Sequence, residues 1–62
     1  MLEKGKVYRL DCPISSPTYT KDGYLWVFLG ARVMDGVKRQ VFKSVATGEV
    51  NWWPPRWMEK LD

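Results

Sequence analysis

The clearest alternation of side chains runs through residues 24–34, "YLWVFLGARVM". The odd-numbered positions are all aliphatic, namely Leu25, Val27, Leu29, Ala31 and Val33. The even-numbered ones begin with an aromatic ladder of Tyr24, Trp26 and Phe28. Successive residues of a strand point to opposite faces, and β-branched and aromatic enrichment favours a strand over a helix. We therefore predict a strand whose aliphatic face lies in the core. The aromatic ladder is then either covered by other parts of the chain or is a binding platform.

Turn signals divide the rest of the chain into short segments. Asp35-Gly36 between strand-like runs predicts a type I′ hairpin turn, which needs positive φ at both central positions. The returning strand, "VKRQVFKS", does not alternate cleanly, so we expect a bulge near Val41 and Phe42. The next turn, "ATGE", is predicted to place Gly48 in the left-handed region.

Further strands are expected at residues 7–10 and 50–53. Pro54-Pro55 ends the second of these, because neither proline can donate to a ladder. The remaining "RWMEKLD" has room for one helical turn and a short terminal strand. The long loop over residues 13–23 is a second candidate for a binding face, since unstructured loops of such length are often functional.

Four or five short strands, tight turns and no long helix predict a single all-β domain over residues 1–62, in the form of a small, strongly bent barrel. The adjacent Trp52 and Trp53 must face opposite ways on a strand. With Val50 pointing inward, Trp52 becomes the core residue, and Trp53 joins Pro54 and Trp57 on the outer face.

Composition narrows the possible chemistry. The chain has no histidine and one cysteine, Cys12, which excludes an internal disulfide and the usual zinc ligand sets. No pair of carboxylates suggests acid–base work, so we expect no catalysis, no metal and no cofactor. The lone cysteine and the lack of a signal-like or membrane-spanning apolar run favour a cytoplasmic protein. The net charge of +3, from ten basic and seven acidic residues, permits nucleic-acid binding without requiring it.

Two stretches of the sequence resemble known families. "WPPRWMEKL" resembles the end of SH3 domains and "DGYL" the start of one of their strands. This resemblance implies an SH3-like barrel with a 3₁₀ turn near the C-terminus, in which Tyr24, Pro54 and Trp57 line a groove. "GEVNWWPPRWMEKLD" is similar to the ending of type II, plasmid-borne dihydrofolate reductases, which are tetrameric SH3-like barrels. That similarity implies an enzyme as a further alternative, with Asn51, Trp52 and Trp53 on a pore floor.

Two binding hypotheses follow. In the favoured one, the chain is a phage or accessory protein that binds a protein partner, or a second copy of itself, through an aromatic and proline surface. The residues of that surface are Tyr24, Trp26, Trp53, Pro54 and Trp57. Aromatic side chains concentrate binding energy at such interfaces. In the alternative, an aromatic ladder stacks bases while a basic strand contacts phosphates. The residues of this second site are Tyr24, Trp26, Phe28, Arg32, Lys38, Arg39 and Lys43.

Overall fold

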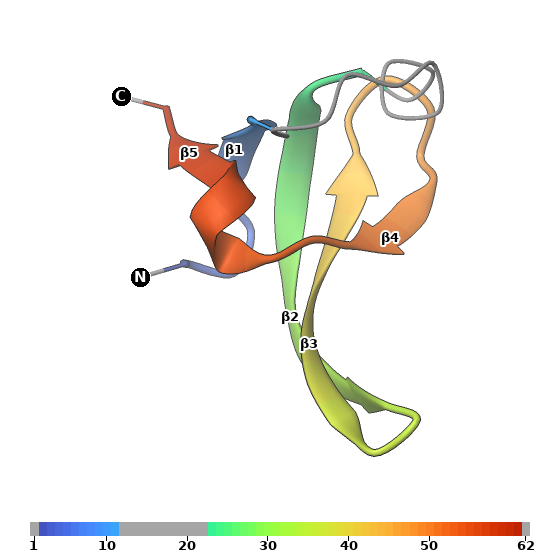
Figure 1. The fold of residues 1–62 in the computed structure, drawn as a ribbon. Helices are drawn as coiled ribbons and strands as arrows, with labels where there is room; N and C mark the ends of the chain where they lie inside the picture. Colours follow the sequence, from blue (N-terminus) through green and yellow to red (C-terminus); the bar gives the residue numbers. More distant parts are fainter. Residues whose placement is uncertain (1, 12–22, 62) are drawn as a thin grey trace.

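Five antiparallel strands form one bent sheet in the computed structural model, which describes residues 2–11 and 23–61. The strands are β1 (Val7–Leu10), β2 (Leu25–Met34), β3 (Val37–Ser44), β4 (Val50–Trp52) and β5 (Met58–Lys60). They lie in the order β4-β3-β2-β1-β5, and the 3₁₀ turn η1 (Pro55–Trp57) is the only helical element of the described part (Figure 1). The predicted all-β, barrel-like fold with a turn near the C-terminus is confirmed. Most of the predicted 13–23 loop lies outside the described residues.

The tight turns form where local chemistry predicts them. Asp35 and Gly36 have φ values of 52° and 75°, as a type I′ turn between β2 and β3 requires. Gly48 has φ of 78° and donates its N–H to the Ser44 carbonyl. The buried Ser44 hydroxyl oxygen accepts backbone N–H groups of Ala46 and Thr47, both at 3.2 Å. Both turn predictions are confirmed.

A β-bulge interrupts the pairing of β2 with β3. Phe28 lies opposite Phe42 but Gly30 lies opposite Val41, so Leu29 is an extra residue on β2. The expected bulge near Val41 and Phe42 is confirmed, with the inserted residue on the facing strand. Because strand faces alternate by residue, this insertion exchanges the odd and even faces of β2 beyond Leu29.

The predicted core face of β2 is wrong. The core is made of Tyr8, Leu10, Trp26, Phe28, Phe42, Trp53 and Met58. Trp26 is fully buried, whereas Leu25 is exposed and Val33, on the distal part of β2, is 73% exposed. Two causes account for the error. Aromatic rings carry the largest apolar area that a small domain can bury, and the bulge prevents the aliphatic positions from sharing one continuous face.

The adjacent tryptophans have the opposite orientation to the one predicted. Trp53 is 7% exposed and Trp52 is 40% exposed. The prediction assumed that Val50 points inward, but Val50 lies opposite Lys43 on the outer face. Because neighbouring strand residues alternate, Trp52 shares the outer face with Val50 and Trp53 enters the core. The Trp53 ring makes an edge contact with Trp26 at 5.3 Å between centroids and lies 6.1 Å from Trp57.

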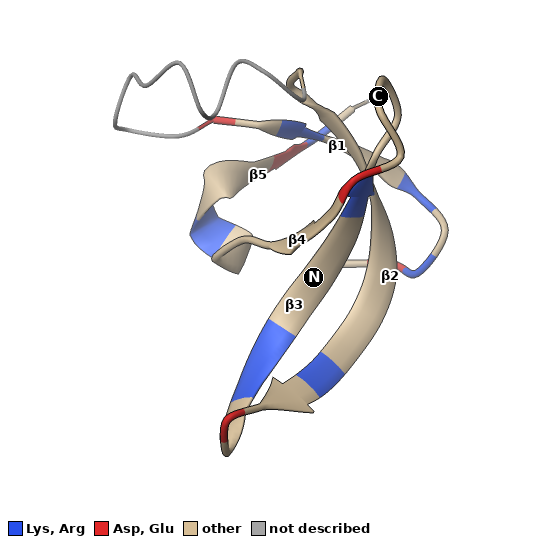
Figure 2. Ribbon diagram, turned by 90° about the vertical axis from the view of Figure 1, so that its right-hand side faces the viewer, with Lys and Arg blue, Asp and Glu red and all other residues tan. Residues whose placement is uncertain are grey.

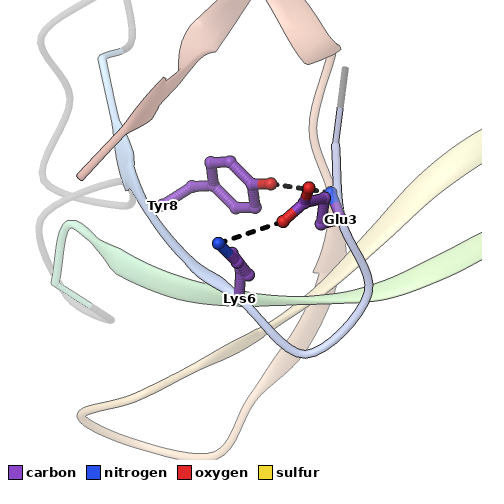
Figure 3. Close-up of polar contacts among 3 residues, drawn as sticks. All are labelled: Glu3, Lys6 and Tyr8. Atoms are coloured by element: carbon purple, nitrogen blue, oxygen red, sulfur yellow. Dashed lines mark hydrogen bonds and ion pairs between the residues drawn. The ribbon is translucent and has the colours of Figure 1, made fainter. Parts of the chain in front are cut away.

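The segment before β1 is pinned to the bulged part of β2. The Gly5 N–H donates to the Phe28 carbonyl at 2.8 Å, and the Phe28 N–H donates to the backbone carbonyl of Lys6 at 3.0 Å. Figure 3 shows the Glu3 backbone N–H donating to the Tyr8 hydroxyl at 2.7 Å, and an ion pair of 3.1 Å between Glu3 and Lys6. The bond to Glu3 gives the hydroxyl of the buried Tyr8 a polar partner. Lys6 lowers the pKa of the exposed Glu3 carboxyl by a hydrogen bond and by its charge.

Candidate binding face

The aromatic and proline surface predicted for a protein partner does not form as a unit. Trp26 and Trp53 are buried in the core, so neither can contact a partner in this conformation. Tyr24 is half exposed, and Pro54 and Trp57 are partly exposed. Backbone hydrogen bonds place Tyr24 and Trp57 on opposite sides of the end of β1, at Leu10 and Asp11 respectively. Three of the five predicted residues therefore remain accessible, and the two tryptophans that were expected to connect them are buried.

The aromatic ladder predicted to stack bases is also buried. Trp26 and Phe28 face the core, and the Trp26 indole N–H donates to the Gly23 carbonyl at 3.1 Å. Tyr24 is the one ladder residue with substantial exposure. The ladder is buried because the aromatic side of β2, rather than its aliphatic side, faces the core.

Three of the four basic residues predicted for nucleic acid lie on one side of the β2–β3 hairpin. Arg32 lies directly opposite Arg39 in the β2–β3 hairpin, and Lys43 follows on the same side of β3 as Arg39. Lys38 lies opposite Val33, on the other side of the hairpin. Figure 2 shows the basic segments on both strands of this hairpin, with one acidic segment at its tip.

Trp52 completes this surface. The Arg39 guanidinium carbon is 3.9 Å from the centre of the Trp52 ring, a cation–π contact across β3 and β4. Trp52 pairs with Val41, which separates Arg39 from Lys43 along β3. We call Arg32, Arg39, Lys43 and Trp52 the basic face. Sequence reasoning missed Trp52 here, although a hairpin register combined with an inward Trp53 would have placed it beside Arg39.

The basic face lacks neutralising partners within the described ranges. Lys6 pairs with Glu3, and Arg9 pairs with Glu59 at 2.9 Å, and neither pair includes a residue of the basic face. None of the three basic residues of the face forms an ion pair with a described residue. Like charges directly opposite one another on a sheet are destabilising. Arg32 and Arg39 are therefore arranged to gain from an anionic ligand.

An aliphatic row borders the basic face. Val7, Val27, Lys43 and Val50 lie opposite one another across four strands, and Val7 and Val50 are exposed. Leu25, two residues from Val27 on the same side of β2, is exposed as well. We call Val7, Leu25, Val27 and Val50 the outer aliphatic row. An exposed apolar row of this kind suits a contact with a macromolecule.

Other kinds of site find little support in the part of the chain that the structure describes. A hollow of about 270 Å³ is lined by Arg9, Leu10, Asp11 and Tyr24. Among these described lining residues, no pair of groups is suited to acid–base chemistry. Of the triplet that the reductase resemblance would place on a pore floor, Trp53 is buried in the core. Within residues 2–11 and 23–61, no group of three potential metal ligands occurs, and no helix has the length and apolarity to span a membrane.

Comparisons with known proteins add no relative. The chain matches no protein-family model, no curated protein and no solved structure.

Proposed function

We propose that this protein is a small non-catalytic module that binds nucleic acid through the basic face. The observation that supports the proposal most strongly is the placement of Arg32, Arg39 and Lys43 on one side of the hairpin without carboxylate partners among the described residues. Phosphate contacts by such side chains supply most of the affinity for nucleic acid and release condensed counterions. The buried ladder takes no part in this proposal.

The geometry of the basic face suits a charged backbone. Arg39 and Lys43 are separated by four residues of a strand, which corresponds to about 13 Å. The Cα atom of Arg32, paired with Arg39, lies about 5 Å away across the hairpin, so Arg32 adds a second cationic side chain. Three long cationic side chains spaced in this way can contact several phosphates at once, since duplex DNA carries about one charge per 3.4 Å along each strand.

A salt series tests the proposal. Binding of a fluorescent mixed-sequence oligonucleotide is measured by anisotropy between about 50 and about 200 mM salt. Three phosphate contacts predict a slope of log K against log salt of about −2.7 for duplex DNA, and of about −2.1 for a single strand. The double variant Arg32→Gln/Arg39→Gln should make the duplex slope shallower by about 1.8. No binding at the lowest salt concentration would refute the proposal.

A matched control separates the basic face from overall charge. Arg56→Gln/Lys60→Gln removes the same two charges from exposed positions on η1 and β5. This variant should keep most of the wild-type slope, because its residues lie outside the hairpin. Equal losses in the two double variants would show that binding depends on net charge alone and would contradict the assignment to the basic face.

Binding to a protein partner or to a second copy is a second candidate, which the outer aliphatic row favours. The exposed Tyr24 and the partly exposed Pro54 and Trp57 keep some of the surface first expected for this role. Size-exclusion chromatography with light scattering tests self-association. Val50→Asp should dissociate an oligomer built on the row, and a wild-type monomer at high concentration would contradict self-association.

The remaining expectations keep the status of predictions. They include a kinship with SH3 domains beyond the all-β, barrel-like fold, an origin in a phage or accessory element, and a cytoplasmic location. If the protein is a tetrameric reductase, the purified protein should reduce dihydrofolate, and a spectrophotometric assay would detect this reaction.

A further inference from the structure

The distal part of the β2–β3 hairpin, residues 30–39, extends beyond the rest of the described molecule (Figure 1). We call it the hairpin arm. β1 pairs with β2 only as far as Val27, and β4 pairs with β3 only from Val41 onward. No other described strand pairs with the arm, so both of its edges are free. The arm is a two-stranded ribbon that carries its own side chains into solvent.

We infer that the hairpin arm enters the major groove of double-helical DNA, so that the ligand of the basic face is a duplex. This inference rests on the proposed function and specifies its ligand. A B-form major groove is about 12 Å wide and about 8.5 Å deep, and it admits a two-stranded β-ribbon. The strand from Gly30 to Met34 reaches about 13 Å, which is more than the depth of the groove. The tip of the arm can therefore reach the edges of the nucleobases while the end of the arm that joins the sheet stays outside the groove.

The side chains of the arm are ordered along its length in a way that suits a groove. Arg32 and Arg39 form a cross-strand pair near the base of the arm. Met34 and Val37 form the next pair on the same side, close to the tip. Cations near the rim can contact the phosphates, while apolar side chains at depth can contact thymine methyl groups. Asp35 lies at the tip, where its carboxylate would face base edges rather than phosphates and can accept from a cytosine amino group.

The aromatic residues argue against a single strand as the preferred ligand. Single-strand binders stack bases on exposed rings. Trp26 and Phe28 are buried, and one face of the Trp52 ring is already occupied by Arg39 at 3.9 Å. Tyr24 is exposed, but it precedes β2 at the end remote from the arm. The described residues thus offer a charged ribbon, and the exposed ring beside it, Trp52, already stacks with Arg39.

Three ligands of equal length test the inference: duplex DNA, single-stranded DNA and double-stranded RNA, each measured with the intact protein at one low salt concentration. We expect duplex DNA to bind at least about tenfold more tightly than the single strand. Double-stranded RNA should bind more weakly than duplex DNA, because its major groove is too deep and narrow for side chains to read. Binding should also protect guanine N7, a major-groove atom, from methylation.

A tip variant separates groove contacts from phosphate contacts. Met34→Ser/Val37→Ser should lower the preference for duplex over single strand by about threefold or more, while the salt slope stays unchanged, because no phosphate contact is removed. Val45→Ser, at an exposed position outside the arm, is the control. If the tip variant loses its far-ultraviolet circular dichroism, Val37→Thr replaces it with a side chain of the same shape.

The possible outcomes distinguish the two proposals. A single strand bound as tightly as the duplex, RNA bound as tightly as DNA, or duplex binding without guanine protection would overturn the groove inference and leave nucleic-acid binding intact. If the protein binds none of the three ligands, both the groove inference and the proposed nucleic-acid binding are overturned. Duplex preference with guanine protection that is lost in the tip variant would support the arm as the groove-reading element.

Discussion

Replacing each of the two adjacent tryptophans by alanine tests the orientation that the structure assigns to them. Trp53 is 7% exposed and packs on two other indole rings, so Trp53→Ala leaves a cavity and removes two aromatic contacts. Such truncations cost about 3 to 5 kcal/mol. A chain of 62 residues has a free energy of unfolding of about 3 to 9 kcal/mol at typical values per residue. Trp53→Ala should therefore remove at least a third of the stability.

Trp52→Ala should cost much less, although the two residues are neighbours. Trp52 is 40% exposed and lies on the outer face, where truncation opens no cavity. The loss comprises the contact with Arg39, about 0.5 to 1 kcal/mol, and the burial of part of one ring. We expect a total of about 1 to 2 kcal/mol, which is at least about 1 kcal/mol less than for Trp53→Ala.

Urea denaturation followed by far-ultraviolet circular dichroism measures both losses without relying on tryptophan fluorescence. With an m-value of about 1 kcal/mol/M, the lower end of the usual range of about 1 to 3 kcal/mol/M, Trp53→Ala should lower the midpoint by roughly 3 to 5 M. If the variant has no transition at all, its spectrum in buffer should already be that of an unfolded chain. A loss for Trp52→Ala that equals or exceeds the loss for Trp53→Ala would refute the assigned orientation and the core built on it.

Three further perturbations test local features. Gly36→Ala forces a side chain into a φ of 75° and should lower the free energy of unfolding by about 1 kcal/mol or more, as measured by thermal denaturation. Ser44→Ala removes an acceptor shared by two turn amides and should cost about 1 to 2 kcal/mol in urea, where an unchanged midpoint would contradict that role. Lys6→Gln should raise the pKa of Glu3 toward 4.5 in a carboxyl NMR titration. Because the folded-state pKa is lowered, the pair stabilises the fold above 4.5 and this contribution fades as the pH falls through the lowered value.

Local turn chemistry made much of the fold predictable from sequence. Few residues tolerate positive φ, so Asp35-Gly36 and Gly48 mark in the sequence the positions where the chain adopts it. The position of each turn then fixes where the strands beside it begin and end. The two-residue turn also sets the hairpin register, which is why Arg32 could be expected near the basic strand that contains Arg39. The basic part of the candidate site was therefore accessible to sequence reasoning.

The faces of the strands were not predictable in the same way. Alternation along residues 24–34 looks uninterrupted, because Leu29 is itself aliphatic and gives no sign that it is an inserted residue. Which side is buried depends on the total apolar area that each side offers to the other strands, and this is a property of the whole sheet. The same limitation reversed Trp52 and Trp53, since the inward position depended on where Val50 lay relative to Lys43.

The free edges of the hairpin arm also bear on how the protein behaves at high concentration. Unpaired strand edges with exposed valines invite pairing between molecules, and charged residues next to them act as gatekeepers against aggregation. Lys38 beside Val37 and Arg32 beside Val33 occupy such positions, and Val33 is 73% exposed. A polyanion that neutralises these charges would weaken the repulsion between copies. Turbidity should then rise most steeply near charge balance between protein and polyanion and fall again when either is in excess.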